Sequence, residues 1–218
     1  MRRVMETSNI GVFPLRVSLG ALGARGSFTE WPVFERPGRC SASGDTMPNA
    51  AIDRDTVHSL AEACSDQADA FQPVATRLIK NQRRLSRFFE QNVAEMGPMA
   101  SQVGLYMLSV SLRIFDQIGG RMGKVNGDDI KAATAKVQAA AGEIFPADGT
   151  FHERAKGIEW RAQPHLLDEI LWALFEREDR TDGEVDLEGD KAALVYLMLW
   201  AAVEALDANW RAPESLEA

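Results

Sequence analysis

The chain has 218 residues, of which 45% are hydrophobic and 26% charged, with a formal net charge of −8, and these proportions are typical of a soluble globular protein. No apolar run approaches the roughly 20 residues needed to span a bilayer, which excludes a transmembrane helix. The two cysteines, Cys40 and Cys64, lie far apart and in no C-x-x-C pair, which excludes a disulfide framework and a cysteine zinc site. We therefore expect a reducing, cytoplasmic location.

Residues 1–46 differ in composition from the rest of the chain. They contain six Arg and four acidic residues, a charge of about +2, which leaves about −10 for residues 47–218. Glycine and proline recur through this segment, and no helical or strand period persists in it. We predict a flexible N-terminal extension over 1–46, either disordered or upstream of a true start at Met47, and a helical domain over 47–218.

From Asp53 onward, apolar residues recur at steps of three and four, the period of an amphipathic helix. In chain order, the expected helices cover residues 53–71, 73–96, 98–118, 128–145, 150–160, a stretch that begins at 164, and 187–210. Pro73 either starts the second of these helices or kinks one continuous helix. No segment shows the sustained alternation of a strand. The predicted fold is all-α, a single bundle-like domain of six or seven helices.

Three local patterns refine these helices. Residues 98–118 carry apolar side chains all round, which predicts a central, buried helix. Asp128 is the expected N-cap of the helix that follows it. Thr150 and Glu153 have the spacing of a capping box, in which Glu153 reaches back to the backbone of Thr150.

Positive charge is concentrated in the stretch RLIKNQRRLSRFF, residues 77–89. On one continuous helix, four basic side chains would fall within about 80° of arc, with Arg83 at the edge, and so form a ridge. These four are Arg77, Lys80, Arg84 and Arg87. The ridge is either a docking site for an acidic protein, nucleic acid or a lipid surface, or a solvated helix face neutralised by the protein's own acidic residues in 176–190. Nucleic acid is disfavoured, because Phe88 and Phe89 face mostly inward and the rest of the domain is acidic.

Cofactor and metal signals in the sequence have little specificity. The stretch Gly119-Gly120-Arg121-Met122-Gly123-Lys124 lacks the preceding strand and the Ser or Thr of a phosphate-binding loop, so we interpret it as a glycine turn that ends a helix. Residues 176–190 do not match a calcium-binding EF-hand loop. A mononuclear zinc site would need three nitrogen ligands and a water, and the chain has three histidines. They are His58, His152 and His165, with Asp168 or Glu169 on the same helix face as His165. No Glu-x-x-His of a di-iron bundle occurs.

These observations favour a non-enzymatic helical protein-interaction or regulatory module. Its expected binding surface is either the four residues of the ridge or an exposed apolar groove between the late helices. Its expected partner is an acidic protein, and we expect no cofactor. Two alternatives stay open: a metal-dependent helical-bundle enzyme that uses the three histidines, and a nucleic-acid-binding regulator that uses the ridge. The sequence also leaves homo-oligomerisation open.

Overall fold

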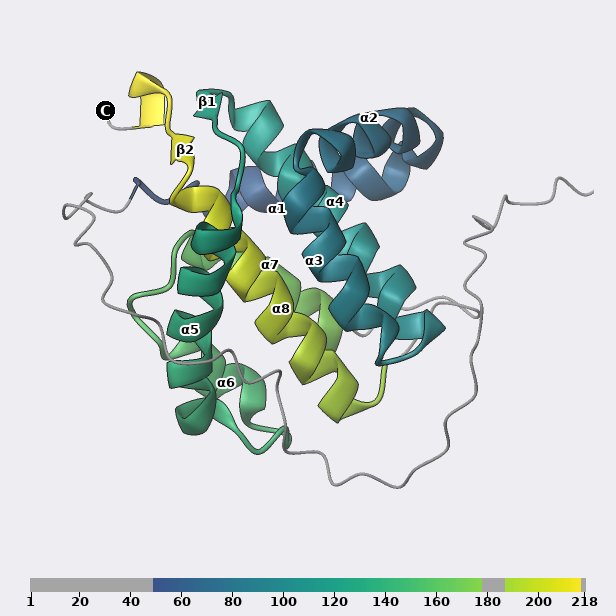
Figure 1. Ribbon diagram of the computed structural model, residues 1–218, viewed down its shortest axis with the longest axis vertical. Coiled ribbons are helices and arrows are strands. Elements are labelled where there is room, and N and C mark those ends of the chain that lie inside the picture. Colours follow the sequence, from purple (N-terminus) through teal and green to yellow (C-terminus); the bar gives the residue numbers. More distant parts are fainter. Residues whose placement is uncertain (1–48, 178–186, 217–218) are drawn as a thin grey trace, which may run out of the picture. The chain divides into compact units, whose positions relative to one another are not determined.

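A computed structural model describes residues 49–177 and 187–216, which belong to one unit, Asp45–Ala218. Eight α-helices occur in these residues (Figure 1). They are α1 (Arg54–Asp66), α2 (Ala68–Asn81), α3 (Arg83–Ala94), α4 (Pro98–Ile118), α5 (Gly127–Ile144), α6 (Phe151–Lys156), α7 (Pro164–Leu171) and α8 (Gly189–Asp207). A π-helical turn, η1 (Trp172–Glu176), continues α7, and a 3₁₀ turn, η2 (Glu214–Leu216), follows the last strand. The all-α prediction is confirmed, whereas the predicted extension over 1–46 lies outside the described residues.

Helix α8 is the centre of the bundle. From Ala192 to Asp207 every residue except the half-buried Leu194 is buried. The helix packs against α3, α4, α5 and α7, and α3 and α5 flank it in Figure 1. A helix that is apolar on all sides is stable in water only in such a position. No helix in the described parts of the chain is both long enough and apolar enough to cross a membrane.

The prediction that residues 98–118 form the central helix was wrong, because one face of α4 is exposed. Leu108 is fully buried against the core, but Met99 is 49% exposed and Tyr106 is 42% exposed. Residues 98–118 do carry apolar side chains all round, but this does not show burial on every side, because apolar side chains also occupy the surface of most soluble proteins. The centre of the bundle belongs to α8 instead.

The segment predicted as one helix over 73–96 is broken at Gln82, between α2 and α3. Pro73 does not start a helix, because it lies inside α2, and the predicted helix over 53–71 instead ends at Gln67, between α1 and α2. Gln82 has φ −103° and ψ 45°, outside the helical range, and its side chain is buried. The Gln82 amide nitrogen donates to the carbonyl of Gly123 at 2.7 Å, and its amide oxygen accepts from the Val125 N–H at 3.0 Å. These long-range bonds fix the break, and no local pattern announces them.

Two of the predicted helix caps differ in the structure. The N-cap of α5 is Asn126 rather than Asp128, and it forms a complete capping box with Asp129. The capping box predicted at Thr150 is absent from α6, whose N-cap makes no side-chain cap hydrogen bond. The hydroxyl of Thr150 donates instead to Asp148 at 2.8 Å, because a turn just before the helix brings that carboxylate within reach.

A short antiparallel ribbon joins two distant parts of the chain. Strand β1 (Arg121–Met122) pairs with β2 (Trp210–Arg211), so that Arg121 lies opposite Arg211. The strands have two residues each, too few for an alternation signal in the sequence. The glycine turn predicted before β1 is confirmed: Gly119 caps the end of α4 with φ +88°.

Candidate binding surface

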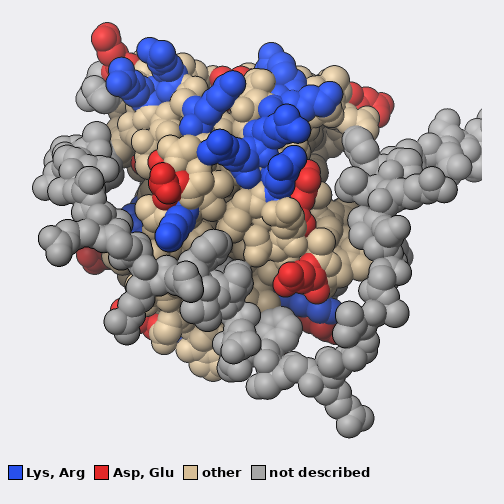
Figure 2. All heavy atoms as spheres, viewed as in Figure 1, with Lys and Arg blue, Asp and Glu red and all other residues tan. Residues whose placement is uncertain are grey.

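Seven exposed basic side chains gather where the α2–α3 junction meets the β1–β2 ribbon. We call them the basic surface: Lys80 on α2, Arg83, Arg84 and Arg87 on α3, Arg121 on β1, Lys124 in the loop after β1, and Arg211 on β2. The two Gln82 hydrogen bonds to the loop after β1 bring that loop against the junction. Figure 2 shows Lys and Arg side chains concentrated over these elements in the upper part of the view.

The ribbon is held firmly under its arginines. The indole N–H of Trp210 donates to the carbonyl of Gly119 at 2.9 Å, and its ring packs edge-on against Phe115 at 5.0 Å between centroids. Gly120 has φ +77°, and a Cβ there would lie 2.3 Å from the carbonyl oxygen of Arg211. Only glycine fits such a position. The backbone that carries the basic surface is therefore ordered by contacts that do not involve its charges.

None of the seven cations forms an ion pair within the described residues. Arg121 and Arg211 face each other directly across the ribbon, an arrangement of like charges that disfavours the pairing. Arg77, which the sequence assigned to the same ridge, is different: its guanidinium lies 3.2 Å from Asp116, a carboxylate shared with Arg113 at 2.8 Å. Arg77 is thus partly neutralised and stays outside the basic surface.

The protein's own acidic residues were the competing explanation for the ridge. Within the described part of 176–190, Glu176 pairs with Lys156 and Glu188 pairs with Lys191, so neither neutralises the basic surface. Residues 178–186 lie outside the described residues, and they hold most of the acidic side chains of that stretch.

The three histidines lie in separate settings. His58 Nδ1 lies 3.0 Å from Glu169 and Nε2 lies 3.4 Å from Glu62, whereas His152 lies 3.9 Å from Glu176. His165 is in the first turn of α7. No three His, Cys, Asp or Glu side chains converge in the described residues in a way that could hold a metal ion. The geometry therefore gives no support to a metal centre built from these histidines.

His58 forms a clamp between α1 and α7. The hydrogen bond to Glu169 raises the pKa of His58, with further contributions from the negative charges of Glu169 and Glu62. The imidazole also packs edge-on against Trp172 at 5.8 Å. Both ring nitrogens face carboxylates, and the bond to Glu169 joins α1 to α7, so the arrangement has the features of a structural contact.

A buried polar network lies beside the C-terminal half of α8. Glu204 accepts from the Ala162 N–H at 2.8 Å, from the Trp200 indole at 3.0 Å and from Lys136 at 2.6 Å. Gln163, whose backbone is left-handed at φ 48°, donates to Asp207 at 2.8 Å. The Gln163 side chain also bonds Ala50 and Ile52, the chain just before α1. Desolvation raises the pKa of Asp207.

Arg161 precedes Ala162 and Gln163 in the chain and adds further buried polar contacts beside them, with its guanidinium almost fully buried. It pairs with Asp168 at 2.9 Å and donates to the carbonyl oxygens of Lys156 and Ile158. Burial raises the pKa of the neighbouring Tyr196 to about 12, so the phenol stays neutral. The members of the network satisfy one another, as expected of a polar cluster that fastens helices together.

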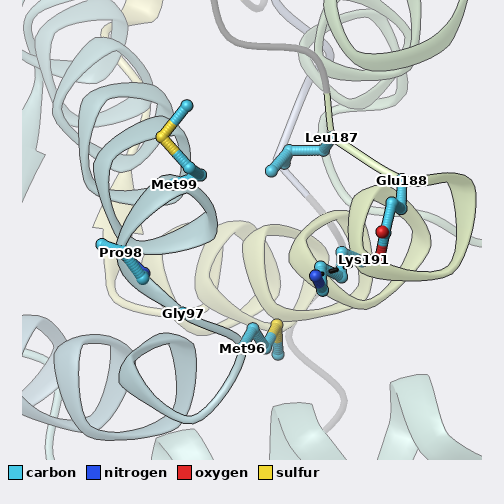
Figure 3. A pocket seen from close by; sticks show the side chains of 7 residues that line it. All are labelled: Met96, Gly97, Pro98, Met99, Leu187, Glu188 and Lys191. Carbon is cyan, nitrogen blue, oxygen red and sulfur yellow. Dashed lines mark ion pairs between the residues drawn. The ribbon is translucent and has the colours of Figure 1, made fainter.

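One pocket, of about 210 Å³, lies between the α3–α4 turn and the start of α8. Met99 and Leu187 face each other across it, and Glu188 and Lys191 form an ion pair at its edge (Figure 3). Small-molecule sites usually enclose more than about 300 Å³ and contain converging polar groups. This pocket has neither property, and it borders residues outside the described ranges.

Part of the basic surface was predictable from the sequence. The predicted ridge contains Lys80, Arg84 and Arg87, with Arg83 at its edge, on one continuous helix. The break at Gln82 divides the predicted ridge between two helices. Arg121, Lys124 and Arg211 were missed, because a ribbon between residues 90 positions apart leaves no periodic signal.

Comparison with known proteins found no match to a protein-family model, to a curated protein or to a solved structure.

Proposed function

We propose that the protein is a non-enzymatic, cytoplasmic interaction module that docks an acidic protein segment on its basic surface. One observation carries the proposal: seven exposed cations share a surface on an ordered backbone, and none of them forms an ion pair within the described residues. Clustered like charges repel one another, and a bound anionic partner relieves that repulsion. The cytoplasmic location rests on the low cysteine content alone.

An acidic protein segment fits the surface better than nucleic acid does. In the described residues, three large hydrophobic side chains are more than 40% exposed, and none of them belongs to the basic surface: Met99, Tyr106 and Trp160. Single-stranded nucleic acid is commonly bound by stacking of its bases on exposed aromatic side chains, which the basic surface lacks. A long duplex carries phosphates along its whole length and would also pass the acidic remainder of a chain with net charge −8, whereas an acidic protein segment needs to contact only the local cations.

A direct test measures fluorescence anisotropy of a labelled polyglutamate peptide titrated with the full chain. We expect binding that weakens as salt is raised. The double reversal Arg84→Glu with Arg87→Glu should lower the affinity at least about tenfold, or about 1.4 kcal/mol. Arg54→Glu is the matched control, because Arg54 is exposed on α1, outside the basic surface, and should leave the affinity unchanged.

Three outcomes would overturn the proposal. The first is no binding of the peptide by the native chain at low salt, and the second is a peptide affinity that the double reversal does not change. The third is tighter binding of a labelled DNA duplex than of polyglutamate, which would favour a nucleic-acid-binding regulator instead.

A further inference from the structure

A second charged surface, acidic rather than basic, runs along α1 and into α2. We call it the acidic stripe: Asp55, Glu62, Asp66 and Asp69, all exposed. The first three recur on one face of α1, because residues seven and eleven positions apart differ by only about 20° in helical angle. Glu62 lies near His58 at 3.4 Å, and the other three make no ion pair within the described residues. One face of α1 therefore carries two carboxylates that form no ion pair within the described residues, Asp55 and Asp66, and Asp69 adds a third in the first turn of α2.

The acidic stripe and the basic surface lie too far apart to neutralise each other within one molecule. The helices that carry most of the two surfaces, α1 and α3, both pack against α4. In Figure 1, α1 is drawn faint because it lies at the back of the view. Asp69 is in the first turn of α2 and Lys80 is in its last turn. At 1.5 Å per residue they are separated by about 17 Å along the helix, well beyond the screening length of about 8 Å at physiological salt.

The acidic stripe also has an apolar anchor beside it. Tyr106 is 42% exposed, and its hydroxyl hydrogen-bonds the hydroxyl of Ser65 on α1 at 3.0 Å. Its ring packs edge-on against Phe71 at 6.2 Å, which holds the exposed edge in place. A fixed aromatic side chain bordered by charges is the composition of many protein–protein contact sites.

We propose that the acidic partner of the basic surface is the acidic stripe of a second copy of this chain. The inference rests on the proposed function and names the partner. The two contacting surfaces differ, so the association is head-to-tail, and it either closes into a ring or extends as an open chain. Charge complementarity brings the surfaces together, and the Tyr106 ring adds apolar contact to the pairing.

Sedimentation velocity of the full chain, over a concentration series at low and at high salt, tests this inference. The native chain should sediment faster as its concentration rises at low salt, and high salt should abolish that rise. Two double variants should each stay monomeric: one carries Arg84→Glu and Arg87→Glu, and the other carries Asp66→Lys and Asp69→Lys. An equimolar mixture of these two variants should associate, since each retains the surface that the other lacks.

Glu143→Lys with Glu159→Lys is the matched control, a double reversal of exposed acids outside the stripe, and should associate as the native chain does. A native chain that stays monomeric throughout the low-salt series overturns the inference, and so does a mixture that stays monomeric. Polyglutamate anisotropy separates this failure from that of the proposed function. The Asp66→Lys, Asp69→Lys variant should still bind the peptide; if the native chain binds it and never self-associates, only the identity of the partner is wrong.

Discussion

The buried network beside α8 and the basic surface use the same kinds of side chain in opposite ways. In the network, Glu204 accepts three hydrogen bonds, and Arg161 has both a carboxylate and carbonyl oxygens as partners. On the basic surface the cations are exposed and lie beside one another without acidic partners among the described residues. Polar groups whose partners are all internal stabilise the fold, whereas a cluster of like charges without such partners is the feature on which the proposed binding function rests.

Removing Glu204 should produce the largest loss of stability. Glu204→Ala leaves the Ala162 N–H and the Trp200 indole without an acceptor in the interior, at about 1 to 3 kcal/mol for each group, and deprives Lys136 of its partner. We expect urea denaturation to show a loss of about 4 kcal/mol. Glu143→Ala, on an exposed face of α5, is the control and should be nearly neutral. If Glu204→Ala lowers the free energy of unfolding no more than the control does, the network does not stabilise the fold.

The two faces of α4 provide the next contrast. Leu108 is fully buried, so Leu108→Ala should lower the free energy of unfolding by about 3 kcal/mol, within the range for core truncations. Met99 lies on the exposed face of the same helix, and Met99→Ala should cost under about 0.5 kcal/mol. Chemical denaturation of both variants measures this difference directly. A loss at Met99 as large as the loss at Leu108 would show that both faces of α4 are buried, and it would contradict the assignment of α8, rather than α4, to the centre of the bundle.

Gln82 links the interior to the basic surface. Gln82→Ala leaves the Gly123 carbonyl and the Val125 N–H without their side-chain partner, so we expect a loss of about 1 to 3 kcal/mol. Amide hydrogen exchange should also rise at Val125, because its N–H donates to this side chain. Asn81→Ala, at an exposed neighbouring position, is the control. Unchanged exchange at Val125 in the Gln82 variant would show that the loop is held by other contacts.

The His58 clamp predicts a smaller, pH-dependent effect. Its folded pKa is raised above the ordinary value of 6.5, first by the hydrogen bond to Glu169. Its contribution to stability is therefore fully present below about pH 6.5 and is lost as the pH rises through the folded pKa. Thermal melts should show His58→Gln less stable than the native chain in acid, with the difference shrinking in alkali. A difference that grows with pH would contradict the clamp, and His165→Gln serves as the control.

The fold was largely predictable because its signals are local. Period-three and period-four apolar residues, Pro98 at a helix start and the glycines after Ile118 fix most helix boundaries without any knowledge of tertiary contacts. The break at Gln82 was not predictable, since it depends on hydrogen bonds to residues some 40 positions away. The distinction between α4 and α8 failed for a related reason, because both are apolar and only packing decides which one lies at the centre.

The part of the basic surface that lies on successive turns of one helix was predictable from the sequence. Arg84 and Arg87 are neighbours on α3 in sequence and in space. The contribution of Arg121 and Arg211 depends on a two-residue pairing across the chain, which composition and periodicity do not encode. The sequence thus located the positive charge but not its full extent.

The most direct test of the central claim is the free energy of unfolding of the Arg84→Glu, Arg87→Glu chain, measured by urea denaturation at a protein concentration at which the native chain is monomeric. If the basic surface is not used by the fold, the double reversal should change stability by no more than about 0.5 kcal/mol, or raise it slightly as repulsion with Arg83 and Lys80 turns into attraction. A loss well above about 1 kcal/mol would contradict the account, because these cations would then be paired with the chain's own acidic residues and serve the fold.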